Sequence, residues 1–138
     1  GPAYQVVESA WRDGDRAVAR LADPLPANHV PADSRLVAAP RLFELCFQTA
    51  GLWQAGHEGR LALPMRVGAA RVMASTDPAA PLHATAHQTG PDQFDCVVTD
   101  GDGNVVVRLD GYRTIPLPAP IPESVAADLA AAFADRTR

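Results

Sequence analysis

One stretch of the chain has the pattern of a helix that is apolar on nearly every side. It begins at Pro40, its side chains as far as Trp53 are mostly apolar, and Gly56 is the expected stop. Proline is favoured in the first turn of a helix, and glycine favours its end. A helix that is apolar all round must be covered by other structure. We therefore expect this helix to lie at the centre of the domain, covered on all sides.

Segments on both sides of this helix predict strands. Before it, Val6–Arg12 and Arg16–Leu21 flank Asp13-Gly14-Asp15, a hairpin turn in which glycine tolerates a positive φ. Prolines between residues 22 and 37 predict a loop. After the helix, four further strands are expected, at Met65–Ser75, Pro81–Thr89, Gln93–Thr99 and Asn104–Ile115.

This order of elements favours an α+β fold in which a bent antiparallel sheet wraps around one long central helix. Such a sheet and a helix that is apolar all round complement each other, and the arrangement is the hotdog fold. We expect this domain to span residues 1–115. The prolines from Pro116 to Pro122 predict an extended exit segment, and Glu123–Arg136 has the spacing of a short amphipathic helix. Residues 116–138 are therefore expected to form an exit segment and a short helix, which is either a linker to a next module or a flap that packs on the domain.

Composition narrows the function without identifying it. The 138 residues, 47% of them hydrophobic and 20% charged, suit one globular domain. A net charge of −4 and the lack of a basic cluster argue against nucleic-acid binding. No apolar run has membrane-spanning length, and no signal peptide opens the sequence, so we expect a cytoplasmic protein without membrane contact. The opening Gly1-Pro2 suggests a piece of a longer polypeptide or a protease scar.

Two polar side chains interrupt the apolar helix. Glu44 and Gln48 are four residues apart and therefore share one face. A carboxylate there is costly unless it is partnered, neutralised or beside a cavity, although this face also suits contact with solvent. The cysteines, Cys46 and Cys96, have neither disulfide nor metal spacing and predict two buried thiols. The histidines are not expected to bind a metal. His83 and His87 lie on one strand, face outward and are too far apart to share an ion, and His29 and His57 are expected to be exposed.

Several motifs resemble the second half of polyketide synthase dehydratase domains. Gly1-Pro2-Ala3-Tyr4-Gln5 resembles the Gly-Pro-Ala-Phe-Gln that opens that half, and Trp11–Asp15 lies where the family has its first hairpin. Ala39–Gln48 is similar to the helix motif His-Pro-x-x-x-Asp-x-x-x-Gln, and Leu63-Pro64 to the Leu-Pro that enters the next strand. The resemblance covers residues 1 to 115. The sequence from Glu44 to Trp53 is most similar to that of dehydratase-like domains of polyunsaturated-fatty-acid-type or iterative synthases.

The resemblance implies half of a double hotdog that removes water from a 3-hydroxyacyl thioester. In the family the first hotdog supplies a His base in a His-x-x-x-Gly-x-x-x-x-Pro motif, and the second supplies an Asp acid. The substrate is carried on the phosphopantetheine of an acyl carrier protein, and no other cofactor is implied. The expected partners are that carrier and another hotdog, either the missing half or a second copy. Because a bare edge strand invites pairing, we expect a homodimer or a covered edge.

The chain departs from the family pattern at the residues that carry the chemistry. The base motif cannot be found in it, Ala39 replaces the motif His, and Glu44 replaces the motif Asp. The resemblance makes Glu44 the candidate general acid, with Gln48 orienting its carboxyl group or contacting the substrate hydroxyl. An apolar pocket favours the protonated form that an acid needs, whereas the first helical turn favours the ionised form. The residues expected to bind substrate, for which packing is the alternative role, are Tyr4, Pro40, Phe47, Leu63 and Pro64.

Three functions remain open from the sequence. The first is a dehydratase domain of a polyketide or fatty acid synthase. The second is a non-catalytic pseudo-dehydratase that shapes the acyl tunnel or holds the synthase dimer together, which the changes at Ala39 and Glu44 favour. The third is a free-standing hotdog acyl thioesterase.

Overall fold

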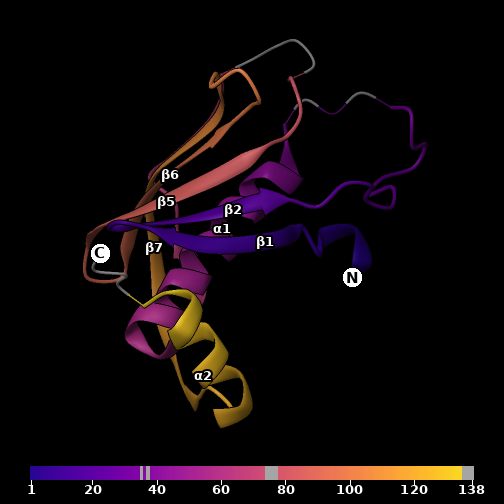
Figure 1. The fold of residues 1–138 in the computed structure, drawn as a ribbon. Helices are drawn as coiled ribbons and strands as arrows, with labels where there is room; N and C mark the ends of the chain where they lie inside the picture. The colour runs from indigo at the N-terminus through magenta and orange to yellow at the C-terminus, as the bar shows by residue number, and fades with distance from the viewer. Residues whose placement is uncertain (35, 37, 74–77, 135–138) are drawn as a thin grey trace.

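A strongly curled antiparallel sheet wraps around helix α1 (Pro40–Trp53) in this computed structural model, which describes residues 1–34, 36, 38–73 and 78–134 (Figure 1). Within the described residues the sheet has seven strands, in the order β1-β2-β5-β6-β7-β3, and β4 also pairs with β7. A short 3-10 turn, η1 (Pro2–Tyr4), precedes the first strand. The strands are β1 (Val7–Asp13), β2 (Arg16–Leu21), β3 (Arg60–Arg66), β4 (Ala69–Val72), β5 (His83–Gly90), β6 (Gln93–Thr99) and β7 (Val105–Pro120). The predicted hotdog architecture is confirmed.

The predicted first hairpin is confirmed. β1 and β2 pair antiparallel, with Asp13 opposite Arg16, and Gly14 in the turn has φ +61°. β5 also shows the predicted alternation, because Ala84 and Ala86 are buried in the core while His87 faces the outer side and lies 3.2 Å from the Asp15 carboxylate. Local sequence signals were sufficient for these elements.

The single strand expected at Met65–Ser75 is wrong. The structure has two strands here, β3 and β4, which pair with successive parts of β7 and are separated at Gly68. β7 bends at Gly111, which has φ +62°, and the Gly68 amide donates to the Asp110 carbonyl at 3.0 Å. A Cβ at position 68 would lie 2.9 Å from that carbonyl oxygen. The close approach of two backbones therefore separates the strands; residues 74 and 75 lie outside the described part of the chain.

The sheet also continues past its expected end at Ile115. β7 runs to Pro120 and pairs with β3, with Pro116 opposite Ala62 and Pro120 opposite Arg60. The proposed boundary at residue 115 thus falls inside a strand, and residues 116–120 belong to the sheet rather than to an exit segment. The helix expected at Glu123–Arg136 is α2 (Glu123–Ala132), and the last residues of that prediction lie outside the described residues.

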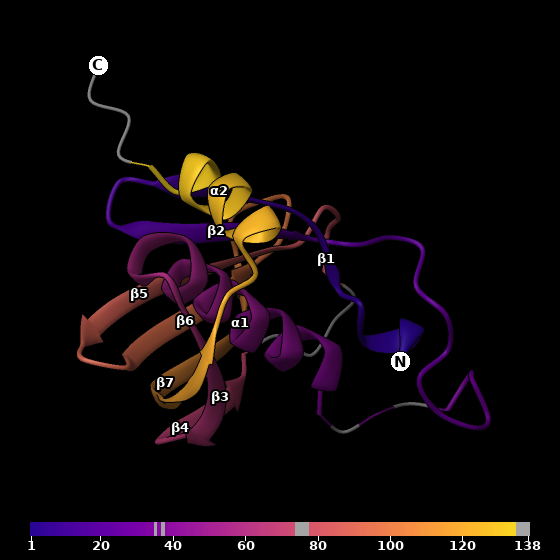
Figure 2. The same ribbon diagram turned by 90° about the horizontal axis from the view of Figure 1, so that it is seen from below.

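The C-terminal helix is anchored to the hotdog by Phe133. This side chain is buried against Gly56, where an added Cβ would lie 2.7 Å from the ring, and the Phe133 carbonyl accepts a hydrogen bond from Arg12 Nη1 at 3.0 Å. Gly56 lies in η2 (Gln54–Glu58), a π-helical turn that prolongs α1 beyond its expected stop and ends at Gly59. Figure 2 shows α2 lying close to this end of the helix.

Replacing Phe133 by alanine is expected to lower the free energy of unfolding by about 3 kcal/mol, because a buried aromatic ring leaves a cavity. Urea unfolding measures the change. The control is Val125→Ala on the same helix, where a side chain 46% exposed should change stability by less than about 0.5 kcal/mol. Equal effects of the two variants would show that α2 is not anchored through Phe133.

The expectation that α1 is covered on every side is wrong for this chain. The face toward the sheet is fully buried, at Leu45, Cys46, Thr49, Ala50 and Trp53. The rest of the helix is only half-buried: Phe43 and Phe47 flank the core, and Glu44 and Gln48 lie on the face away from the sheet. The reason is geometric: the sheet curls around one side of the helix, as Figure 2 shows, and nothing in the described residues fully covers the other.

The cysteines are two free, buried thiols, as predicted. Contact with Cys46 and burial together raise the pKa of the Cys96 thiol well above its usual value, so this thiol stays protonated in the core. In the part of the chain that the structure describes, no helix has both the length and the apolar character to cross a membrane.

Candidate active site

The candidate site begins with a hydrogen bond between the two polar residues of α1. Gln48 Nε2 donates to Glu44 Oε1 at 3.0 Å, so the i, i+4 spacing produces the interaction predicted for it. The same nitrogen donates to the Tyr4 backbone carbonyl at 2.8 Å. Because both hydrogens of the amide are used, Gln48 is fixed in position and holds one carboxyl oxygen of Glu44. The other oxygen has no hydrogen-bond partner among the described residues.

The N-terminal turn η1 lies beside this polar face. The Ala3 carbonyl accepts from Arg41 Nε at 3.1 Å, and two turns further along α1 the Tyr4 carbonyl accepts from Gln48 Nε2. The Tyr4 hydroxyl accepts from Asn28 Nδ2 at 3.3 Å, and Asn28 Oδ1 lies 2.8 Å from His29 Nδ1. Tyr4 therefore has a positioning role through its backbone and links the site to the proline-rich loop through its side chain.

An aromatic pair joins α1 to β7. The rings of Phe47 and Tyr112 have centroids 4.9 Å apart with an interplanar angle of 39°. Burial raises the pKa of the Tyr112 phenol, and the nearby Cys96 and Glu44 raise it further. The phenol is therefore protonated at neutral pH and close enough to Glu44 to respond to its charge. Sequence reasoning missed Tyr112, because only the curl of β7 brings it to the helix.

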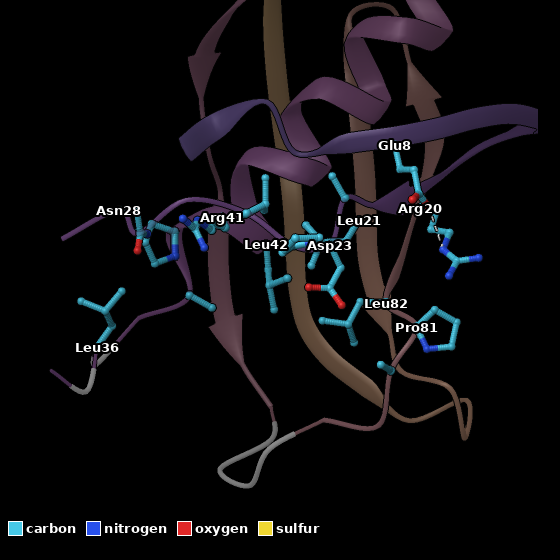
Figure 3. A pocket seen from close by; sticks show the side chains of 16 residues that line it. Glu8, Arg20, Leu21, Asp23, Asn28, Leu36, Arg41, Leu42, Pro81 and Leu82 are labelled. Carbon is cyan, nitrogen blue, oxygen red and sulfur yellow. Dashed lines mark ion pairs between the residues drawn. The ribbon is translucent and has the colours of Figure 1, made fainter. Parts of the chain in front are cut away.

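A hollow of about 760 Å³ opens at the first turn of α1, between the proline-rich loop and the ends of β2 and β5. Figure 3 shows Arg41, Leu42 and Leu82 among its walls. Pro40, one of the residues expected to bind substrate, lines it, whereas Glu44 does not and lies one turn further along the helix. The hollow and the acid are thus neighbours on α1 rather than parts of one cavity.

The other residues expected to bind substrate lie away from this hollow. Leu63 and Pro64 are on β3 at the edge of the sheet, where Leu63 is 49% exposed and pairs with Ile115. Phe47 packs on Tyr112. Within this chain the structure brings together Glu44, Gln48 and Tyr4, and it does not bring Leu63 or Pro64 to them.

The four histidines take other contacts. His83 packs edge-on against Trp11, His57 stacks on Trp53, and His87 pairs with Asp15. His29 is half-buried rather than exposed, and it approaches the site only through Asn28 and Tyr4. No cluster of three potential metal ligands occurs in the described residues. Among these residues, no histidine is hydrogen-bonded to Glu44 or Gln48.

Comparison with known proteins decides the family. A family model described as the polyketide synthase dehydratase N-terminal domain matches residues 1–124. The chain belongs to this dehydratase family. A curated relative, polyketide synthase ThaG of Burkholderia thailandensis, is 35% identical over 116 residues, which is 83% of this chain and 2% of that protein.

Solved structures agree with the family on the fold. The erythromycin dehydratase is 26% identical with a TM-score of 0.61, covering 82% of this chain and 37% of that structure. A bifunctional dehydratase-cyclase domain of ambruticin biosynthesis is 25% identical with a TM-score of 0.62, covering 85% and 42%. The dehydratase domain of the CurF module of curacin polyketide synthase has a TM-score of 0.66 at 22% identity, covering 85% and 41%. This dehydratase-family chain therefore spans less than half of the solved dehydratase domains and a small part of its curated relative.

Proposed function

We propose that this chain is one hotdog of a polyketide synthase dehydratase and that Glu44 is its general acid. The observation that supports this is the Gln48 bridge, which holds the Glu44 carboxyl group on the half-buried face of α1. Family membership supplies the reaction class, because the relatives are polyketide synthases and their dehydratase domains.

The proposed chemistry is the elimination of water from a 3-hydroxyacyl thioester carried on an acyl carrier protein. A base removes the proton from C2, and the electron pair of that C–H bond forms the C2–C3 double bond. The C3–O bond breaks as Glu44 donates its proton, so the hydroxyl leaves as water and Glu44 becomes a carboxylate. General-acid assistance of this kind contributes about 10²- to 10⁴-fold to a rate. The base is expected from a partner hotdog.

Motif residues favour the second half of the double hotdog as the position of this chain. Gly1–Gln5 and the Ala39–Gln48 helix resemble that half, whereas the description of the matching family model names the N-terminal domain. The resemblance of Glu44–Trp53 to polyunsaturated-fatty-acid-type or iterative synthases is part of the same proposal. The carrier protein, its phosphopantetheine and a cytoplasmic location follow from the proposed synthase.

A partner hotdog, the missing half or a second copy, is proposed to cover the open face of α1 and the edge strand β3. β3 has no strand partner on its outer side in the described sheet, and Leu61, Leu63 and Met65 along it are 37%, 49% and 63% exposed. An exposed apolar edge strand is prone to pair with another chain. In the chain alone this predicts a homodimer.

Replacing both Leu63 and Met65 by lysine is expected to convert that dimer to a monomer, because two charges at an edge strand oppose pairing. Light scattering after size exclusion measures the mass. The control is Trp11→Lys, a large side chain 40% exposed on β1 at the other end of the sheet, which should leave the dimer intact. A wild-type chain that is monomeric at high concentration would contradict the pairing.

A non-catalytic role in shaping the acyl tunnel or holding the synthase dimer together is the second candidate. It is favoured by the replacement of the motif His by Ala39 and by the longer Glu44. The test uses the synthase region that contains both hotdogs, incubated with a 3-hydroxyacyl carrier-protein thioester. Formation of the enoyl product supports the dehydratase, and its absence supports the scaffold.

A further inference from the structure

The hollow beside α1 has the size and lining of a ligand site. Its volume of about 760 Å³ lies within the range of about 300–1,000 Å³ typical of small-molecule pockets. Most of its wall is aliphatic, from Leu21, Leu25, Leu42, Pro40, Pro81 and Leu82. Such a lining accepts an apolar chain, and the few polar groups among these side chains decide what else the ligand must carry.

Arg41 is the polar group in this wall that lacks a complete set of partners. Its Nε donates to the Ala3 carbonyl at 3.1 Å, but its Nη2 is buried and has no hydrogen-bond partner among the described residues. A guanidinium is always charged in proteins, and a buried charged donor without an acceptor is costly. The first turn of α1 carries positive partial charge as well, so the helix does not offset this cation.

The other charged groups of the hollow do not neutralise Arg41. Arg20 Nε lies 2.9 Å from a Glu8 carboxyl oxygen, so these two charges satisfy each other. Asp23 is exposed and forms no ion pair with Arg41 in the described structure. Figure 3 shows Arg41 with Asn28 at one side of the hollow and the Glu8–Arg20 pair at the other, with Leu42, Asp23 and Leu82 between them. One end of the hollow thus has in its wall an arginine that forms no ion pair among the described residues.

We propose that this hollow binds an acyl chain that carries a carboxylate, and that the carboxylate pairs with the guanidinium of Arg41. The inference rests on the proposed function only for the acyl character of the ligand. The phosphate of a phosphopantetheine arm is an oxyanion of similar chemistry. Aliphatic walls favour the carboxylated chain, because the two amides of the arm would lose water there without gaining partners.

The test is binding of decanoate and methyl decanoate to the 138-residue chain, followed by NMR titration. Decanoate is expected to shift the signals of Arg41 and the surrounding leucines. Arg41→Met should weaken decanoate binding by about tenfold to a hundredfold, the range for a hydrogen bond to a charged group, and leave methyl decanoate binding unchanged. Arg20→Met is the matched control, because that cation is already paired with Glu8, and it should change decanoate binding less than twofold.

Three results would overturn the inference. The first is no decanoate binding at the hollow, and the second is equal binding of decanoate to the wild type and to Arg41→Met. The third is binding of 4′-phosphopantetheine, lost in Arg41→Met, at concentrations where decanoate does not bind, which would assign the oxyanion to the carrier arm. Unchanged methyl decanoate binding shows that Arg41→Met is folded. Because no dehydration is measured, the proposed acid role of Glu44 can fail while this binding holds, and the reverse is also possible.

Discussion

Glu44→Gln is expected to lower kcat for dehydration by about 10³-fold in the synthase region that contains both hotdogs, within the usual contribution of a general acid. Glutamine has nearly the same shape, and its amide oxygen can still accept the hydrogen bond from Gln48 Nε2. The variant therefore keeps the geometry and removes only the transferable proton. KM for the carrier-protein thioester is expected to change little. Enoyl product formation, followed by mass spectrometry of the carrier, measures the rate.

Two further variants separate the acid from its surroundings. Glu8→Gln removes a carboxylate that pairs with Arg20 on the β1–β2 hairpin, and it should leave the dehydration rate unchanged. Gln48→Leu removes the group that orients Glu44 and should give a smaller loss than Glu44→Gln, because the proton donor remains. Dehydration by Glu44→Gln at the wild-type rate would show that another group is the acid.

Gln54→Leu is expected to lower the free energy of unfolding by about 3–4 kcal/mol, because a buried hydrogen bond and a partly buried hydrogen bond to a carboxylate are lost together. The Gln54 side chain is fully buried at the end of α1. It accepts from Thr114 Oγ1 at 2.9 Å and donates to Asp92 Oδ1 at 2.9 Å. The substitution leaves the buried Thr114 hydroxyl without this acceptor. Urea unfolding, with the slope compared between variants, measures the effect.

A matched control and a double-mutant cycle make this prediction specific. Gln93→Leu, at a half-buried glutamine with no side-chain hydrogen bond in the described structure, should change stability by less than about 0.5 kcal/mol. Combining Gln54→Leu with Thr114→Val should cost less than the sum of the two single changes, because neither partner is then left unsatisfied. A loss below about 1 kcal/mol for Gln54→Leu would contradict this account of the buried bonds.

The sequence predicted the elements whose signals are local. The turn at Asp13-Gly14-Asp15, the alternation of β5 and the Glu44–Gln48 pair each depend on residues within a few positions of one another. The hotdog fold then followed from the one unusually apolar helix and the number of strands. These features required no knowledge of distant contacts.

The errors arose where distant segments decide the structure. The split between β3 and β4 depends on the bend of β7 at Gly111, more than forty residues away. The extension of β7 through prolines is possible because the pairing of β6 with β7 reaches only Arg113, and proline is tolerated where a strand has one neighbour. Beyond that point β3 is the strand that pairs with it.

Part of the candidate site was likewise beyond sequence reasoning. Tyr112 carries no local signal, because the curl of the sheet that brings it to Phe47 is a tertiary feature, and the burial of Arg41 Nη2 is a tertiary feature as well. An arginine in the first turn of a helix is nevertheless unfavourable beside the positive end of the helix dipole. That conflict is the one sign in the sequence that Arg41 has a role other than stabilising the helix.

Alkylation from the carrier protein tests the central claim most directly, namely that a carrier-borne substrate reaches the Glu44 position. The acyl carrier protein is loaded with a pantetheine that ends in a chloroacetamide and is mixed with the two-hotdog region carrying Glu44→Cys. Cys46 and Cys96 are buried, so their cross-linking in the region without an added cysteine gives the background rate. We expect faster cross-linking at Glu44→Cys, although position 44 is half-buried, than at Val125→Cys, where the side chain is 46% exposed on α2. Faster cross-linking at Val125→Cys, the more exposed of the two positions, would contradict the account.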